Sequence, residues 1–151
     1  MRDLIGYGEN RPDFYWPNHS KIALNFVINY EEGSERSPLH SDPIAETYGG
    51  EFPLSPKPQG IRNLSMESLF EYGSRVGIWR LIHLFHKESI PLTFFATGMA
   101  LKLNPELCHY LSSSSDEIAG HGWRWIDYAE ITKDEERVHI KQCIQTIDEQ
   151  T

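Results

Sequence analysis

The sequence has only two cysteines among its 151 residues, and no apolar run approaches the roughly 20 residues that a membrane span needs. Two cysteines are too few for a disulfide scaffold, and Cys108 and Cys143 lack metal-ligand spacing. We therefore expect both to be reduced and packed among apolar side chains. Residues 1–7 lack the apolar stretch of a signal peptide. These absences predict a cytoplasmic protein with no membrane partner.

Positive charge is also scarce, because 14 Lys and Arg face 22 Asp and Glu, for a net charge of −8. The imbalance is the same in both halves of the chain, and no basic arm or stripe stands out. This counts against a nucleic-acid partner. A hydrophobic content of 39% excludes a disordered chain and is enough for one packed domain.

Three apolar runs rich in β-forming residues alternate with three helical patterns. The expected strands are residues 21–29, 92–97 and 117–120, the first of them buried on both faces. The expected helix starts are Ser65, Asn104 and Thr132, each a residue type that caps helices. This order predicts an α/β fold with parallel strands.

Two of the expected helices carry apolar residues at helical spacing. The first helix extends to about Lys87 and should bury Ile78, Leu81, Ile82 and Phe85. The last helix should bury Ile140, Ile144 and Ile147.

Residues 34–64 form a long irregular stretch with five of the nine prolines. Long loops inside compact domains are often functional, so we interpret this segment as a functional loop. It could form a lid over a small pocket or pack outside the fold.

Polar residues follow two of the expected strands. Glu31 and Glu32 come after the first strand and His121 after the third, and parallel α/β folds bind ligands at these strand ends. A carboxylate and an imidazole in one cleft are the minimum for acid–base hydrolysis. Taken singly, adjacent glutamates are often solvated charges, and a histidine beside aromatic residues is often a packed side chain.

Other aromatic and histidine residues have ordinary structural interpretations. Trp123 and Trp125 suit a core as well as a sugar-stacking platform. His83 and His86 share a helix face, where packing is favoured over metal ligation. Four further histidines have no visible partner in the sequence: His19, His40, His109 and His139.

Several sequence blocks recur in the order of a known family. They are residues 2–8, 29–33, 65–68, 71–75, 98–101 and 121–128. On these blocks the chain resembles the N-terminal half of the polysaccharide deacetylase (NodB-homology) family, and within it the branch of cofactor-independent allantoinases. The resemblance implies a partial (β/α) barrel with about three βα units and a long loop after the first strand. Residues 1–151 would be the N-terminal part of one barrel domain.

The resemblance also implies roles for individual residues. Glu31 stands at the position of the family's general base, and Glu32 at that of a metal ligand. His121 stands at the position of the first of the family's two metal-binding histidines, but Trp125 stands at the position of the second. One histidine and one carboxylate fall short of the three protein ligands of a catalytic zinc. Asp127 could supply a third ligand, but its spacing differs from that of the family motif. We therefore expect no cofactor, with zinc or another divalent metal on Glu32 and His121 as the alternative.

The expected catalytic residues are Glu31, Glu32 and His121. The expected substrate-binding residues are Tyr30, Trp123, Arg124, Trp125 and Asp127.

Three hypotheses of function remain open. The first is metal-free hydrolysis of a cyclic amide in a small ureide, as the allantoinase branch implies. The second is metal-dependent deacetylation of an N-acetylated sugar polymer. The third is a truncated chain without activity of its own, since such barrels typically take about 250 residues. It would associate as a homo-oligomer or with a complementary second chain through its open sheet edge.

Overall fold

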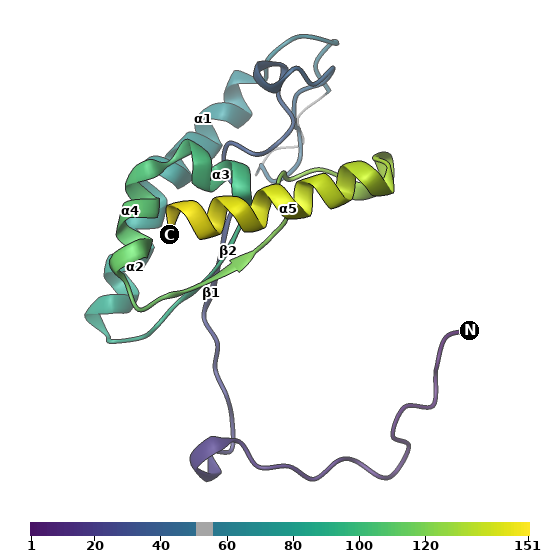
Figure 1. The fold of residues 1–151 in the computed structure, drawn as a ribbon, viewed down its shortest axis with the longest axis vertical. Helices are drawn as coiled ribbons and strands as arrows, with labels where there is room; N and C mark the ends of the chain where they lie inside the picture. Colours follow the sequence, from purple (N-terminus) through teal and green to yellow (C-terminus); the bar gives the residue numbers. More distant parts are fainter. Residues whose placement is uncertain (51–55) are drawn as a thin grey trace.

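The computed structural model describes residues 1–50 and 56–151. Its centre is a three-stranded parallel sheet of order β1-β2-β3, with helices packed around it (Figure 1). The strands are β1 (Val27–Tyr30), β2 (Thr93–Ala96) and β3 (Glu117–Gly120). The expected α/β fold with parallel strands is confirmed, and the bounds of the third strand match the prediction.

The first strand is shorter than predicted and is buried on only one face. The expected strand began at Lys21, but β1 begins at Val27, and residues 21–26 are exposed. Within β1, Ile28 and Tyr30 are buried while Val27 and Asn29 are exposed. The prediction of burial on both faces was wrong because helices cover one face of this strand and leave the other open to solvent.

The helix predicted from Ser65 to Lys87 is a continuous helical rod in three parts. It consists of α1 (Leu64–Tyr72), a π-helical segment (Gly73–Gly77) and α2 (Ile78–Lys87). The N-cap is Asn63 rather than Ser65, and its side-chain amide donates to the carbonyl of Glu46 instead of capping the helix.

Fewer residues of α2 are buried than the apolar periodicity predicted. Ile78 and Ile82 are buried and Phe85 packs beside them, but Leu81 is 41% exposed. His83 is exposed rather than packed.

Two helices follow β2, of which one was predicted. The unpredicted helix is α3 (Gly98–Leu103), which begins directly after the strand. The expected helix is α4 (Pro105–Ser113), and the Asn104 side chain caps it by accepting from Leu107 N at 3.1 Å.

The last helix, α5 (Lys133–Gln150), begins with the predicted capping box of Thr132 and Glu135. Its buried residues are Cys143 and Thr146, whereas two of the expected ones, Ile140 and Ile144, are exposed. The periodicity of the isoleucines was misleading because glycines in the neighbouring elements decide which face packs.

Two of those glycines bring α5 close to the sheet. A Cβ atom on Gly98 would lie 2.9 Å from the Cα of Cys143, and one on Gly120 would lie 3.3 Å from its Sγ. The small side chain of Cys143 therefore packs against the end of β3, and the expected Ile147 packs beside it, while Ile140 and Ile144 are exposed.

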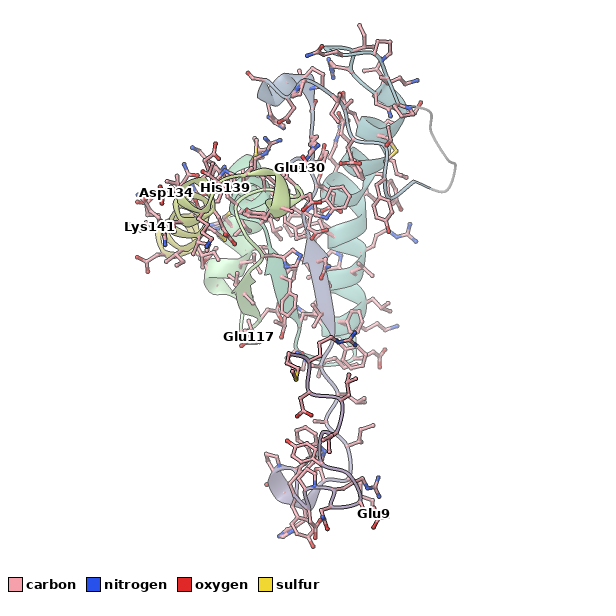
Figure 2. All side chains as sticks on the ribbon, turned by 90° about the vertical axis from the view of Figure 1, so that its right-hand side faces the viewer. Glu9, Glu117, Glu130, Asp134, His139 and Lys141 are labelled. Atoms are coloured by element: carbon pink, nitrogen blue, oxygen red, sulfur yellow. The ribbon has the colours of Figure 1, made fainter. Side chains whose placement is uncertain are left out.

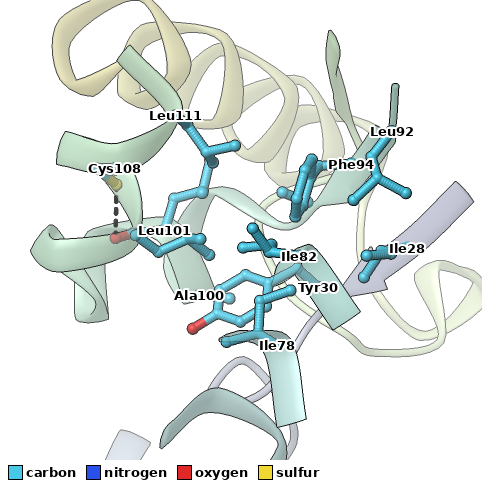
Figure 3. Packing of buried hydrophobic residues seen from close by; sticks show 12 residues of the cluster. Ile28, Tyr30, Ile78, Ile82, Leu92, Phe94, Ala100, Leu101, Cys108 and Leu111 are labelled. Carbon is cyan, nitrogen blue, oxygen red and sulfur yellow. Dashed lines mark hydrogen bonds between the residues drawn. The ribbon is translucent and has the colours of Figure 1, made fainter. Parts of the chain in front are cut away.

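The core lies between the sheet and helices α2, α3 and α4 (Figure 3). It consists of Ile28, Tyr30, Ile78, Ile82, Leu92, Phe94, Ala96, Ala100, Leu101, Leu107, Cys108 and Leu111. Both cysteines are buried free thiols, as predicted, and Cys108 Sγ donates to the carbonyl of Leu101 at 3.2 Å.

The N-terminal residues 1–26 run away from this body as an exposed segment with one short 3₁₀ turn at Pro17–His19 (Figures 1 and 2). In the part of the chain that the structure describes, no helix has both the length and the apolar character needed to cross a bilayer.

Candidate active site

Glu31 and His121 meet at the carboxyl ends of the three parallel strands. Tyr30 lies opposite Ala96, and Ala96 opposite Gly120, so the residues that follow the three strands emerge side by side. Nε2 of His121 lies 2.8 Å from Oε1 of Glu31, and both side chains are partly exposed. This distance permits direct proton transfer between a carboxylate and an imidazole.

A buried turn positions Glu31. The carbonyl of Glu31 accepts hydrogen bonds from the backbone N–H of Ser34 at 3.0 Å and from its hydroxyl at 2.5 Å. The Ser34 hydroxyl in turn accepts from Thr97 Oγ1 at 2.9 Å, and both Ser34 and Thr97 are fully buried. The turn after β1 is therefore attached to the end of β2.

The backbone and the ring of His121 are both held by β2. Its N–H donates to the carbonyl of Ala96 at 2.9 Å, which continues the sheet pairing beyond β3. Its ring stacks on Phe95, with 6.0 Å between centroids. One edge of the imidazole remains accessible, since the side chain is 41% exposed.

Glu32 lies partly buried beside this pair. Its Oε2 accepts from the N–H of Glu31 at 3.1 Å, and its carboxyl lies against Gly73, where any Cβ atom would collide with it. Burial raises the pKa of Glu32, its backbone hydrogen bonds oppose the rise, and the neighbouring charges of Glu31 and Glu35 add to it. Glu32 therefore retains a proton more readily than a solvated glutamate.

A small cavity of about 170 Å³ is lined by Glu31 but not by His121, which contacts Glu31 from outside this lining. Its lining combines carboxylates with aromatic rings: Asn29, Glu31, Glu32, Glu35, Tyr48, Gly49, Phe70 and Trp125. Tyr48 stacks on Trp125 with 6.0 Å between ring centroids, which forms an apolar wall facing the carboxylates.

The loop over residues 34–64 contributes directly to this cavity through Tyr48 and Gly49. Residues 51–55 of the loop lie outside the described residues. The part from 34 to 50 packs against the ends of β1 and β3.

Arg124 anchors that loop. Its Nη1 and Nη2 donate to the two carboxylate oxygens of Asp42 at 2.9 and 2.5 Å, and Nη2 also donates to the carbonyl of Glu35 at 3.0 Å. Although burial acts in the opposite direction, hydrogen bonds from Arg124 and Ser37 N hold the pKa of Asp42 below its ordinary value. Arg124 was predicted to bind substrate, and the structure engages its Nη atoms with the loop.

Two more predicted substrate-binding residues lie away from the small cavity. Tyr30 is in the core, where its hydroxyl accepts from Asn104 Nδ2 at 2.7 Å and burial raises its pKa to about 12. Trp123 packs over Gly98, where an added Cβ atom would lie 2.7 Å from the indole.

Asp127 accepts from Ala129 N at 2.9 Å as the cap of a short 3₁₀ helix at Tyr128–Glu130. Of the five predicted substrate-binding residues, the structure places Trp125 at the small cavity.

Sequence reasoning missed several cavity residues. Asn29 carries a weak signal, because it lies two positions before Glu31 and so shares a face of the strand. Glu35 comes from the turn, while Tyr48 and Phe70 come from a loop and a helix whose placement the sequence pattern does not reveal.

A larger cavity of about 550 Å³ lies on the other side of Glu32. Its lining includes Glu35, Arg62, Glu67 and Arg75, but neither Glu31 nor His121. It therefore lies apart from the acid–base pair.

The described residues do not fit a three-ligand metal site. No group of three His, Cys, Asp or Glu side chains converges among them. Trp125 stacks on Tyr48 at the position of the second family histidine, and Asp127 is engaged as a cap. Glu32 and His121 alone fall short of the three protein ligands of a catalytic zinc.

Fold and site together define a domain of the polysaccharide deacetylase class, whose members hydrolyse carbon–nitrogen bonds. The family model for polysaccharide deacetylase matches residues 64–151, and the chain belongs to this family. The resemblance stated from the sequence blocks is thereby confirmed.

Solved structures agree with this assignment. The PuuE allantoinase structure and that of a probable polysaccharide deacetylase from Pseudomonas aeruginosa PAO1 each superpose with a TM-score of 0.93 at 48% identity. Each match covers 99% of this chain and 50% of the solved chain. These matches confirm the expected partial barrel.

Two further relatives extend the comparison. A Schizosaccharomyces pombe protein, described provisionally as a polysaccharide deacetylase, is 44% identical over 148 residues, which are 97% of this chain and 46% of that protein. A Mycobacterium smegmatis structure shares the fold at 22% identity, with a TM-score of 0.68 over 91% of this chain and 42% of that one. The chain thus spans about half the length of these relatives.

Proposed function

We propose that this chain carries the acid–base pair of an allantoinase-like hydrolase that opens a cyclic amide in a small ureide. The observation that carries the proposal is the 2.8 Å contact of His121 with Glu31, the carboxylate that lines the 170 Å³ cavity. Pockets for drug-sized ligands measure about 300–1,000 Å³, so this cavity suits a smaller substrate than a sugar polymer.

The chemistry follows from the pair itself. Glu31 accepts a proton from water as the water oxygen bonds to the amide carbon. His121 then gives a proton to the leaving nitrogen as the carbon–nitrogen bond breaks. The 2.8 Å contact lets the proton pass from Glu31 to His121, which restores both groups for the next turnover. Glu31 is the assigned base because it is the carboxylate that contacts His121.

The cavity walls orient the substrate in this proposal. The stacked Tyr48 and Trp125 rings offer a flat apolar surface for a planar ureide ring. The amide side chain of Asn29 can donate to a carbonyl and accept from an N–H.

The test is incubation of the purified chain, alone and mixed with the C-terminal half of a full-length relative, with allantoin and, separately, with N-acetylglucosamine oligomers. Ring opening of allantoin, lost in Glu31→Gln and in His121→Asn, is the expected result. Acetate release from the oligomers without ring opening would refute the ureide hypothesis.

Metal-dependent N-deacetylation is the second candidate, and the names of two relatives favour it. Here Glu32 and His121 would hold the metal with a further donor from outside the described residues. Metal analysis separates the candidates, because stoichiometric zinc together with loss of activity under chelators would support the deacetylase and contradict a metal-free hydrolase.

We also propose that the chain requires a partner chain for activity, because it exposes apolar surface. Among the described residues the sheet has three strands, so one edge of β1 and one edge of β3 lack a paired strand. Val27 in the outer strand β1 is 41% exposed, and Ile144 on α5 is 63% exposed. Either a second copy or a chain with the remaining βα units would cover such surface.

Two measurements test this requirement: light scattering for the oligomeric state and an assay of allantoin ring opening. Both are made on the purified chain, alone and mixed with the C-terminal half of a full-length relative. Ring opening that appears only in the mixture would support it. A monomer that is fully active alone would refute it.

A further inference from the structure

Residues 121–123, the segment that carries His121, are held by three hydrogen bonds between backbone groups and by one from the backbone to a side chain. His121 N donates to the carbonyl of Ala96, as described above. The carbonyls of Gly122 and Trp123 accept from Gly98 N at 2.9 Å and from Met99 N at 3.0 Å, the first amides of α3. The remaining bond is made by Trp123 N, which donates to a side chain, the hydroxyl of Tyr128, at 3.2 Å.

The Tyr128 hydroxyl is itself fixed by α5. Its oxygen lies 3.2 Å from Nδ1 of His139, and the two rings meet edge to face with 5.7 Å between centroids. The hydroxyl donates to Nδ1 in the His139 tautomer with Nδ1 unprotonated, and accepts from Nδ1 through its second lone pair in the other tautomer. Figure 2 labels His139 on this helix.

The backbone between His121 and Tyr128 leaves little freedom. Gly122 adopts a φ of +80°, and a Cβ atom there would lie 2.9 Å from the Tyr128 hydroxyl oxygen. The hydroxyl thus packs against the residue that directly follows His121. A shift of this oxygen would move the peptide from which the His121 side chain projects.

We propose that Tyr128 is a positioning residue for His121, and that His139 of α5 holds Tyr128 in place for this role. The inference deepens the proposed function, on which it rests. It assigns to α5 the task of orienting the imidazole toward Glu31, through a hydroxyl that touches neither substrate nor reacting atoms. His139, which has no visible partner in the sequence, gains one.

The surroundings of His139 favour its neutral form. Burial lowers the pKa of His139, nearby Arg124 lowers it further, and Glu135 on the same helix opposes them. The neutral imidazole is the form that accepts from Tyr128.

The experiment follows the His121 ring by NMR in the full chain with labelled histidine, and needs no turnover. Stacking on Phe95 gives the His121 ring protons a ring-current shift and contacts to the Phe95 ring. Tyr128→Phe removes the hydroxyl and keeps the ring, so we expect the His121 signals to move and these contacts to weaken. Signals of the exposed His83 should stay in place, and the exposed Tyr7→Phe is the matched control.

A second pair of variants separates positioning from loss of stability. His139→Asn places an acceptor near the position of Nδ1, whereas His139→Leu has none. We expect His139→Asn to keep the wild-type His121 signals and His139→Leu to reproduce the change seen in Tyr128→Phe, at a temperature where all variants are folded. His121 signals that are unchanged in both Tyr128→Phe and His139→Leu would overturn the proposal.

Where ring opening is measurable, a kinetic readout follows. Misplacement of a catalytic group by about 1 Å can cost 100-fold in rate, so Tyr128→Phe should lower kcat by roughly 10- to 100-fold with KM little changed. If Glu31→Gln leaves ring opening intact, the proposed function fails, while the NMR result for Tyr128 still decides the positioning inference.

Discussion

Glu31 and His121 contact each other across the end of β2, because one follows β1 and the other follows β3, the two outer strands of the sheet. The parallel register makes this contact possible, and the turn through Ser34 and Thr97 holds it. A carboxylate at this distance from an imidazole both orients the ring and exchanges a proton with it.

Glu31→Gln should abolish most of the ring-opening activity. General acid–base catalysis contributes about 10²- to 10⁴-fold, and an amide in place of the carboxylate cannot accept the proton, so a loss of at least about 100-fold is expected. Allantoin consumption measures it, and Glu9→Gln in the exposed N-terminal segment is the control. Retention of activity within threefold would remove Glu31 from the catalytic role.

Arg124→Leu should destabilise the chain and loosen the loop. The substitution removes the Arg124 donors from Asp42, which keeps Ser37 N, and from the carbonyl of Glu35, and a part-buried acceptor left unsatisfied costs about 1–3 kcal/mol. Urea unfolding measures the change. The exposed pair of Arg137 and Asp134 supplies the control, since Arg137→Leu should change stability by less than about 1 kcal/mol. Equal effects of the two variants would argue against Arg124 as an anchor.

Glu32→Gln should stabilise the chain at neutral pH. Burial raises the pKa of Glu32 in the folded state above its ordinary value of 4.5, so the folded state favours the protonated form. Its contribution is fully present below pH 4.5 and is lost as the pH rises through the raised pKa. Unfolding at a series of pH values should show a stabilising difference at pH 7 that disappears below pH 4.5. A difference independent of pH would contradict the burial of an ionisable Glu32.

Gly73→Ala and Gly77→Ala form a matched pair within one π-helical segment. Alanine is favoured over glycine in helices by about 0.5–1 kcal/mol. At Gly77 the new Cβ meets its nearest neighbour at 3.6 Å, so this gain should appear in full. At Gly73 the new Cβ collides with the Glu32 carboxyl, so the gain should be reduced and the carboxyl displaced.

Thermal unfolding of both alanine variants, with allantoin binding by calorimetry, checks this prediction. Gly73→Ala should weaken binding, and Gly77→Ala should leave it unchanged. Equal binding by the two variants would show that the position of Glu32 does not matter to the site.

Short-range signals in the sequence were reliable where hydrogen bonds within a few residues decide the structure. The Asn104 cap and the capping box of Thr132 and Glu135 occur as predicted, because each joins a side chain to backbone two or three positions away. The unpredicted α3 begins without a side-chain cap, since carbonyls of the distant Gly122 and Trp123 accept from its first amides.

By itself, then, the sequence determined the family, the parallel order of the strands and the identities of Glu31, Glu32 and His121 as candidate catalytic residues. Only the tertiary structure decided that Glu31 contacts His121, that Arg124 anchors the loop, and that α5 leaves Ile144 exposed. The reason is physical. Motifs and caps act over a few residues, whereas strand register, the close approach at Gly98 and the partners of a charged side chain depend on segments far apart in the chain.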